Sequence, residues 1–309
     1  MSKTYYKIHK LRIQSDFDLK LPSCFKVGRI DNPDLSVETG STSHSKLDPV
    51  APPYLFYGSG KLVHNYGFPI PCNFSIESLE GKTRIMVTDL YRKLPNINVD
   101  EIIDYVTDLK LLQKGLVKIH GAAVKFNNNG IMVVGWDGCG KSTLAFNFLK
   151  KGAGFLSDDT IIIDENYAYS YPKPIKMFQG LNSITRMLNN IPYANKFIGN
   201  YKRVVPNNIV DQSKIKYIFI SRYGEKQIKR LSEDEAFKAL MILAVYRTKR
   251  RDAKNLALAY CHYSKYDFDS LLESRRNVLK RFLKDVECYE ITSRNPKESM
   301  ELIDKTIGS

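Results

Sequence analysis

The stretch GWDGCGKST, residues 135–143, decides the fold class that we assign to this sequence. Its first eight residues match the pattern G-x-x-x-x-G-K-[ST], the signature of a phosphate-binding loop. Four β-forming residues, 131–134, come directly before it, and residues 141–151 have the composition of a helix that ends at Gly152. Because a strand, a glycine-rich loop and a helix follow one another in this order, we predict an α/β domain that binds a nucleotide.

The residues of this loop have distinct physical roles. Glycines at positions 135, 138 and 140 let the backbone form a nest of N–H groups that point at phosphate oxygens. We expect Lys141 to contact the β- and γ-phosphates and the Ser142 hydroxyl to bind Mg²⁺, while the positive end of the helix dipole favours the anion. A chance glycine-rich turn is the alternative, and the flanking strand and helix argue against it. The residues expected to line the nucleotide are Gly135, Asp137, Gly138, Cys139, Gly140, Lys141, Ser142 and Thr143.

An acidic pair and a histidine lie at equal distances on either side of the loop. Ser157-Asp158-Asp159 begins fifteen residues after Ser142, and His120 lies fifteen residues before Gly135. At the end of a second strand the two carboxylates would stand beside the loop. One could then bind Mg²⁺ and the other could accept a proton from an attacking hydroxyl. The pair could instead form a turn or only a metal site, and His120 taken alone is as readily a hydrogen-bonded structural histidine.

Two other classes of P-loop protein are excluded by motifs that the chain lacks. A G-domain needs the element Asn-Lys-x-Asp to bind its base, and the only Asn-Lys, in Asn195-Lys-Phe-Ile198, has no aspartate at that position. The Leu-Ser-Gly-Gly-Gln segment of transporter ATPases is also absent. The acidic pair and the histidine are therefore the features that must indicate the class.

The chain divides into a β-rich N-terminal region, residues 1–97, and an α/β domain, residues 98–309. In the first region, residues 3–21 partly alternate apolar and polar side chains, which predicts short strands. Residues 31–53 carry Asp, Asn, Ser, Thr, Gly and several prolines with little periodicity, so we predict a long exposed loop there.

In the second region, predicted strands and helices are mixed. Helical spacing over residues 99–112 predicts the first helix. Residues 117–134 predict a β-hairpin whose turn is Asn127-Asn-Asn-Gly130. Ser232-Glu-Asp-Glu235 is a capping box that predicts the start of another helix, and Pro296 stands at the first position of a third.

Bulk composition limits the partners and the location of the protein. The formal net charge of +14 favours an anionic partner, although solvated lysines in a biased composition explain it more simply. No apolar run approaches the ~20 residues needed to span a bilayer. The N-terminus has no apolar signal region, so we expect a cytoplasmic protein without a membrane partner. The five cysteines show no paired spacing that would indicate zinc or disulfides.

Three stretches together resemble the C-terminal catalytic domain of the HPr kinase/phosphorylase family. They are IHGAAV at residues 119–124, the P-loop, and KGAGFLSDD at residues 151–159, at the spacings found in that family. Residues 6–19, 217–222 with 228–240, and 291–307 resemble a divergent branch, the HPr-kinase-like proteins of peptide-modification and biosynthetic gene clusters, which include kinases of precursor peptides. The resemblance implies a P-loop kinase domain of the HPr-kinase/PEP-carboxykinase type.

The resemblance also assigns roles to individual residues. In the family the second aspartate of the pair is the catalytic base, the histidine belongs to the active site, and the P-loop serine binds Mg²⁺. These roles fall on Asp159, His120 and Ser142. Lys141 is then expected to contact the phosphates, and Asp158 is expected to contact the metal.

One segment departs from the family pattern. Residues 179–187 contain no acidic residue where the family has a Glu-Ile-Arg-Gly-Leu-Gly-type segment, which argues against dephosphorylating activity and against HPr as the substrate. A cation near this segment could still stabilise the charge on the transferring phosphoryl group, and Lys202, Arg203 and Arg186 are the candidates. The alternative for these residues is a solvated basic turn.

Together these observations predict a kinase that transfers the γ-phosphoryl group of ATP, with Mg²⁺, to a hydroxyl, and a serine of a protein or peptide is the expected acceptor. A kinase of small-molecule hydroxyls is the first alternative. The second alternative is a regulator that uses ATP as a switch. It includes a less favoured nucleic-acid-binding protein, for which the basic run 246–251 is the candidate surface. The family resemblance further implies a ring or dimer, so a homo-oligomer is expected.

Overall fold

The computed structural model describes residues 3–52, 54–67, 72–94, 99–178, 201–246 and 251–308. The chain forms two compact units. The first contains Met1–Val117 and Tyr246–Val278, and the second contains Lys118–Val245 and Leu279–Ser309. The division differs from the one expected from the sequence, because the helix that begins at residue 99 and the later segment 246–278 both join the first unit.

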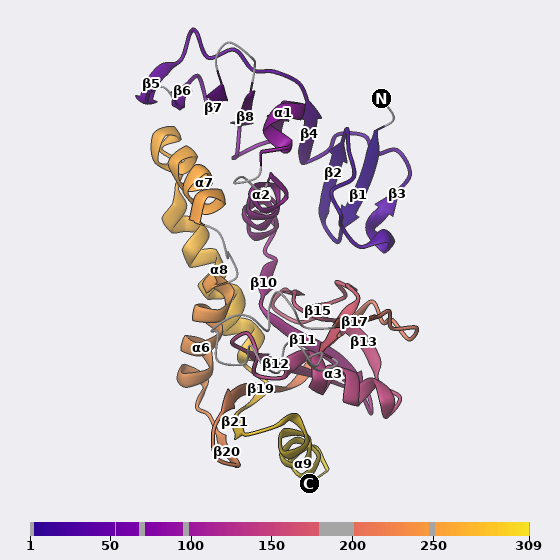
Figure 1. Ribbon diagram of the computed structural model, residues 1–309. Coiled ribbons are helices and arrows are strands. Elements are labelled where there is room, and N and C mark those ends of the chain that lie inside the picture. The colour runs from indigo at the N-terminus through magenta and orange to yellow at the C-terminus, as the bar shows by residue number, and fades with distance from the viewer. Residues whose placement is uncertain are drawn as a thin grey trace, which may run out of the picture. The chain divides into compact units, whose positions relative to one another are not determined.

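The first unit contains a nine-stranded sheet, and Figure 1 labels most of its strands. In spatial order its strands are β3 (Lys26–Val27), β1 (Thr4–Ile8), β2 (Leu11–Ser15), β4 (Leu35–Thr39), β9 (Thr83–Val87), β8 (Cys72–Glu77), β7 (Lys61–Gly67), β6 (Leu55–Gly58) and β5 (Asp48–Ala51). β4 pairs in parallel with both β2 and β9, and the other neighbouring strands are antiparallel. The short strands expected over residues 3–21 are present as β1 and β2.

The prediction of a long exposed loop over residues 31–53 is wrong, because β4 and β5 lie within it. In β4 the side chains of Leu35 and Val37 are fully buried, and the backbone bonds to a strand on each side. Such a strand is specified by its neighbours more than by its own short pattern, which the surrounding polar residues and prolines conceal.

The first unit also contains helices of different lengths. They are η1 (Ser23–Phe25), α1 (Asp89–Arg92), α2 (Val99–Gln113), α7 (Arg251–Ser264) and α8 (Phe268–Leu283), and the last residues of α8, from Leu279, belong to the second unit. α2 packs against α7, and α7 packs against β7. α2 covers the helix predicted over residues 99–112, and Gly115 beyond it has a φ of +72°, which is typical of a helix end.

The second unit is built on a six-stranded mixed sheet. In spatial order its strands are β13 (Gly154–Ser157), β11 (Gly121–Phe126), β12 (Asn129–Gly135), β19 (Ile215–Tyr223), β21 (Glu287–Ser293) and β20 (Gln227–Arg230). β12, β19 and β21 are parallel, so their carboxyl ends meet at one edge. Helices α3 (Lys141–Lys150) and α9 (Pro296–Ile307) pack on the sheet and on each other, around a core that includes Leu144, Phe148, Phe219 and Ile303 (Figure 1). The predicted α/β fold class is confirmed.

Two smaller sheets and a further helix lie in the second unit, except for Val117 and Tyr246, which belong to the first. One sheet contains β10 (Val117–Ile119), β14 (Ile161–Ile163), β15 (Ala168–Tyr169) and β18 (Gln212–Ser213), and the other pairs β16 (Ile175–Phe178) with β17 (Tyr201–Val204). The helix is α6 (Glu233–Tyr246). Within the described ranges, none of the helices has the length and apolar character that crossing a membrane requires.

Several local sequence signals of the second unit are confirmed. Asn127 and Asn128 form the turn between β11 and β12, with φ values of 48° and 62° that a tight hairpin turn requires. The capping box of α6 forms in both directions: the Glu235 N–H donates to Ser232 Oγ over 3.3 Å, and the Ser232 N–H donates to Glu235 Oε2 over 2.9 Å. Asn295 caps α9 with its side chain.

Candidate active site

The GWDGCGKST stretch forms a tight loop between β12 and α3. Gly135, Gly138 and Gly140 have φ values of 144°, 89° and 89°, which glycine adopts without strain. At Gly135 a Cβ atom would lie 2.6 Å from the Ser221 carbonyl oxygen and 2.9 Å from the Cys139 sulfur, so no larger residue fits there. Ser221 Oγ also donates a hydrogen bond of 2.9 Å to the Cys139 carbonyl oxygen. β19 therefore helps to hold the shape of the loop.

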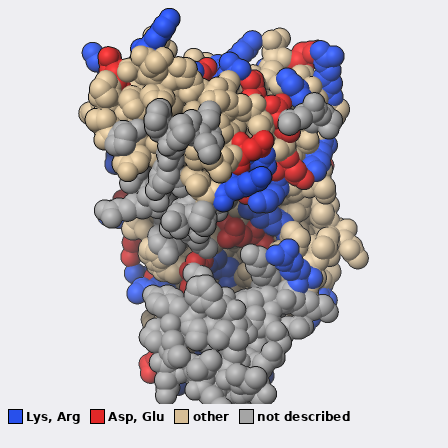
Figure 2. Space-filling model, turned by 45° about the horizontal axis from the view of Figure 1, so that its top comes forward, with Lys and Arg blue, Asp and Glu red and all other residues tan. Residues whose placement is uncertain are grey.

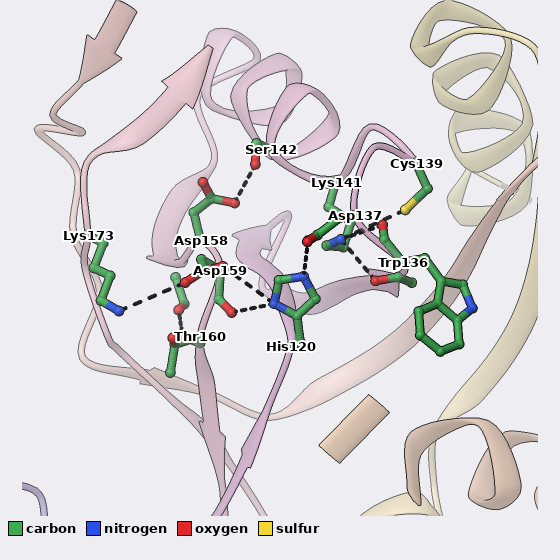
Figure 3. Close-up of polar contacts among 12 residues, drawn as sticks. His120, Trp136, Asp137, Cys139, Lys141, Ser142, Asp158, Asp159, Thr160 and Lys173 are labelled. Atoms are coloured by element: carbon green, nitrogen blue, oxygen red, sulfur yellow. Dashed lines mark hydrogen bonds and ion pairs between the residues drawn. The ribbon is translucent and has the colours of Figure 1, made fainter. Parts of the chain in front are cut away.

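Lys141 lies inside this loop and is only 7% exposed. Its Nζ donates to the carbonyl oxygens of Gly135 and Trp136 over 2.9 and 2.8 Å (Figure 3). Lys141 is also the first residue of α3, and the half-buried Ser142 and Thr143 follow in the first turn. The ammonium group and the unpaired N–H groups of the helix start thus lie at the same helix end, which suits an anion such as phosphate.

The acidic pair begins directly after β13, and its first member contacts the loop. Ser142 Oγ donates a hydrogen bond of 2.9 Å to Asp158 Oδ1 (Figure 3). Asp158 is 5% exposed. Burial is the main cause that raises the pKa of its carboxyl to about 6, and the neighbouring Asp159 carboxylate raises it further while the Ser142 hydrogen bond lowers it. The structure thus joins the acidic pair to the P-loop serine, and the chemical role of that contact stays a prediction.

The oxygen atoms of Ser142 and Asp158 are of the kind that Mg²⁺ prefers. In nucleotide sites Mg²⁺ is usually held by one or two protein oxygens together with phosphate oxygens and waters. Within the described part of the chain, no group of three or more His, Cys, Asp and Glu side chains could hold a metal ion. Ser142 Oγ and Asp158 Oδ1 lie 2.9 Å apart, and their role as protein oxygens for Mg²⁺ stays a prediction.

His120, between β10 and β11, links the acidic pair to the P-loop and is 3% exposed. Its Nδ1 lies 2.9 Å from the Asp159 carbonyl oxygen and 3.5 Å from Asp159 Oδ1, and its Nε2 lies 3.0 Å from Asp137 Oδ1 (Figure 3). Burial lowers the pKa of His120 and Lys141 lowers it further, which outweighs the opposite effect of the two aspartates. Both ring nitrogens thus lie within hydrogen-bond distance of an oxygen, one in the acidic pair and one in the loop.

Asp159 differs from Asp158 in both exposure and backbone conformation. Its side chain is 50% exposed, and its φ is +70°. For a residue with a Cβ this left-handed conformation costs about 1–2 kcal/mol. The bond between its carbonyl oxygen and His120 helps to hold this conformation. The carboxylate of Asp159 is thus accessible to an incoming molecule, whereas the buried carboxylate of Asp158 faces Ser142.

Lys173 is a further cation beside the acidic pair. Its Nζ lies 3.9 Å from Asp159 Oδ2 and 4.9 Å from the centre of the Tyr171 ring. Figure 3 shows Lys173 and His120 on opposite sides of Asp159. No motif marks Lys173, since its place in the site results from the folding of a segment remote from the loop.

The other cations proposed from the sequence are less well placed. Arg186, within the segment 179–187, lies outside the described residues, as do most of the basic run 246–251 and the side chain of Lys202. Arg203 lies on β17, which pairs with β16, and its side chain is exposed. On the described part of the face shown in Figure 2, Lys and Arg side chains are interspersed with Asp and Glu. The roles of these cations stay predictions.

The order of strand, loop and helix, the loop conformation and the adjoining acidic pair define a P-loop α/β unit. No family model matches the chain. It is similar to the HPr kinase/phosphorylase of Lactobacillus johnsonii, with 26% identity over 122 residues, and to that of Lactobacillus gasseri, with 25% identity over 122 residues. Each match covers 38% of this chain and 36% of the relative, so the chain spans only about a third of the length of these curated relatives.

A comparison with solved structures gives a similarity to the HPr(Ser) kinase/phosphatase from Coxiella burnetii. That similarity has a TM-score of 0.24 and 14% identity, and it covers 37% of this chain and 76% of that chain. The two sequence matches confirm the predicted resemblance to HPr kinase/phosphorylases, as that of a divergent relative over the matched part of the chain.

Proposed function

We propose that this protein is a kinase that transfers the γ-phosphoryl group of ATP, with Mg²⁺, to a hydroxyl group, and that the acceptor is a serine of a protein or peptide. The hydrogen bond of 2.9 Å between Ser142 Oγ and Asp158 Oδ1 carries the proposal, because it puts the acidic pair at the phosphate-binding loop. A kinase requires a metal contact and a proton acceptor at that place. The similarity to proteins named HPr kinase/phosphorylase supports phosphoryl transfer as the reaction.

The P-loop would hold the phosphates of the donor. Lys141 Nζ, which bonds to the carbonyl oxygens of Gly135 and Trp136, would exchange those bonds for phosphate oxygens. The loop N–H groups would contact the remaining phosphate oxygens. Ser142 and Asp158 would hold Mg²⁺. When bound, Mg²⁺ supplies positive charge that offsets the charge developing on the phosphate oxygens.

Asp159 is the proposed proton acceptor. Its half-exposed carboxylate can face an incoming hydroxyl and accept the proton as the oxygen attacks phosphorus. His120 positions it, because the ring bonds to the Asp159 carbonyl oxygen and so supports the backbone conformation that directs the carboxylate. The two acids would have separate tasks, because Asp158 is buried against the loop whereas Asp159 is half exposed and open to the acceptor.

The choice of acceptor depends on sequence resemblance rather than on the geometry of the site. Residues 6–19, 217–222 with 228–240, and 291–307 resemble HPr-kinase-like proteins of peptide-modification clusters, so a serine of a peptide is proposed. The reverse reaction, dephosphorylation, is not part of the proposal, because residues 179–187 carry no acidic residue.

Asp159→Asn in the full-length protein tests the proposal. Wild type and variant are incubated with ATP labelled on the γ-phosphate and with peptide or metabolite fractions from the native host. We expect the variant to lose about 10²–10⁴-fold in transfer rate, the usual effect of removing a general base. Nucleotide affinity measured by calorimetry should stay near the wild-type value. Asp285→Asn is the matched control, because this carboxylate is 81% exposed in an ion pair with Lys214, and it should leave both quantities unchanged.

Other outcomes would change the proposed acceptor, the proposed base or the function itself. Label found on a small molecule instead of a peptide would change the class of acceptor. Wild-type transfer rates in Asp159→Asn would remove Asp159 as the base. Nucleotide binding without any transfer, together with steeply salt-dependent binding of nucleic acid, would favour a regulator.

A further inference from the structure

Lys173 gives the acidic side of the site a positive charge. Its Nζ lies 3.9 Å from Asp159 Oδ2, and His120 Nδ1 lies 3.5 Å from Asp159 Oδ1, so each oxygen of this carboxylate faces a nitrogen. We propose that Lys173 is a catalytic residue that binds the γ-phosphoryl group from the acceptor side, exchanging its contact with Asp159 for a phosphoryl oxygen. This role depends on the kinase function proposed above and adds a residue to it.

A second cation is needed here because of the charges that surround the transferring group. The proposed Mg²⁺ would offset the charge of Asp158, whereas the half-exposed carboxylate of Asp159 repels a phosphoryl group that moves toward an acceptor beside it. Lys141 is the cation of the loop, and Figure 3 shows it on the opposite side of the acidic pair from Lys173. Burial lowers the pKa of His120, which disfavours a positive charge on its ring. Lys173 is thus placed to offset charge on the side that the group approaches.

A rigid segment holds Lys173 in place. Pro172 and Pro174 flank it, and a following proline restricts a residue to extended conformations. The Tyr171 N–H donates a hydrogen bond of 3.0 Å to the Leu156 carbonyl oxygen, which ties the segment to β13, the strand that leads into the acidic pair. The ammonium group also lies over the buried Tyr171 ring, 4.9 Å from its centre. A side chain held in this way loses little freedom when it binds phosphate.

In the proposed step the acceptor oxygen forms a bond to the γ-phosphorus. The bond from that phosphorus to the β–γ bridging oxygen breaks, and ADP leaves with the electron pair. The proton of the acceptor passes to Asp159, and Lys173 keeps its own proton throughout. Lys173 acts by offsetting the negative charge on the oxygens of the group in transfer. The sequence favours Lys202, Arg203 or Arg186 for this task, whereas the structure puts Lys173 within ion-pair distance of Asp159.

Lys173→Met and Lys173→Arg in the full-length protein test this role. Lys216→Met is the matched control, because Lys216 Nζ also lies over a tyrosine ring, 5.1 Å from the centre of Tyr217, at the end of β19 away from the loop. Three quantities are measured: turnover of ATP labelled on the γ-phosphate, counted as transfer or hydrolysis; the Kd for Mg·ADP; and the Kd for Mg·ADP with aluminium fluoride, which mimics the phosphoryl group in transfer. Thermal melting of each variant checks the fold.

Lys173→Met should lower turnover by about 10²-fold or more and weaken binding of the fluoride complex by at least about tenfold. Its affinity for Mg·ADP and its melting temperature should match the wild type, because the contact is made only with the terminal group. Lys173→Arg keeps the charge and should recover a large part of both losses. Lys216→Met should behave as wild type in every measurement.

The outcomes separate this role from the kinase function. The role of Lys173 is overturned if wild type and Lys173→Met bind the fluoride complex with equal affinity, whatever the effect on turnover. It is also overturned if the wild type binds Mg·ADP but not the complex of Mg·ADP with aluminium fluoride. If the wild type binds the fluoride complex and transfers nothing, even to water, the kinase function fails. A loss of that binding in Lys173→Met then still supports Lys173 as the phosphoryl ligand. A wild type that binds no Mg·ADP refutes both.

Discussion

Replacing Asp158 by asparagine should make the protein more stable at neutral and alkaline pH while it removes the proposed metal contact. Asparagine has the same shape and keeps an oxygen that can accept the hydrogen bond from Ser142. It lacks the charge, which in Asp158 is buried, since only 5% of the residue is exposed. Burial raises the pKa of the Asp158 carboxyl from its usual 3.8 to about 6, so folding above pH 6 has to bury an ionised group.

The size of the effect follows from the two pKa values of Asp158. The difference between 3.8 and about 6 corresponds to about 3 kcal/mol, at 1.36 kcal/mol for each pH unit. The folded state has the higher pKa and binds the proton more tightly, so this contribution to stability is complete below pH 3.8 and is lost as the pH rises through about 6. Asp158→Asn abolishes that loss. The free energy of unfolding should therefore increase by up to about 3 kcal/mol at pH 8 and change little near pH 4.

Urea unfolding followed by circular dichroism, with EDTA present, measures this difference at the two pH values. Asp285→Asn, at a side chain that is 81% exposed, is the control and should stay within about 0.5 kcal/mol of the wild type. In a separate series without EDTA, Mg·ADP should stabilise the wild type more than Asp158→Asn, because a ligand stabilises the state that binds it. The reasoning is refuted if Asp158→Asn is less stable than the wild type at pH 8, or if its gain is the same at both pH values.

Three further changes test other parts of the site. Gly135→Ala should destabilise the protein by about 1–3 kcal/mol more than Gly138→Ala in urea unfolding, since the added Cβ meets the Ser221 carbonyl oxygen at 2.6 Å at the first position and nothing within 4 Å at the second. Trp136 is the only tryptophan of the chain and is 50% exposed in the loop, so its fluorescence should change when nucleotide is added. Binding detected by calorimetry with unchanged emission would contradict that prediction. His120→Ala should lower the free energy of unfolding by about 1–3 kcal/mol and lower kcat more than it raises KM, because it removes the bridge between the loop and the acidic pair. An unchanged kcat would leave His120 with a structural role only.

Features with local causes could be predicted from the sequence. The loop needs glycine at positions where the backbone is left-handed, as at Gly140, and the turn at Asn127 and Asn128 needs residues that accept a positive φ. The spacing of His120 and Asp158 from the loop makes both of them candidates, and the structure brings both to it. In the loop and in the turn, a few neighbouring residues determine the conformation, so a short pattern is sufficient.

Features that depend on remote contacts could not be predicted. β4 is held by β2 and β9 on its two sides, and the segment 246–278 joins the first unit although the chain on both sides of it belongs to the second. Lys173 reaches Asp159 because Tyr171 bonds to the backbone of Leu156, a pairing that no pattern around Lys173 indicates. The sequence pattern therefore indicates Arg203 and its neighbours as the cations that follow the acidic pair, and not Lys173.

The unfavourable features of the second unit favour a chemical role for this cluster over a packing role. Asp158 is a buried acid, Asp159 has a left-handed backbone, and the buried hydroxyl of Thr160 has no hydrogen-bond partner among the described residues. Asparagine at 158 and glycine at 159 would relieve the first two, so packing alone does not explain why acids stand there. A nucleotide switch needs the loop and a metal contact, but it has no use for a second, half-exposed carboxylate between His120 and Lys173. A change within the loop would impair nucleotide binding in a kinase and in a switch alike. Asp159→Asn would impair only a kinase, so its behaviour decides between the two functions more directly.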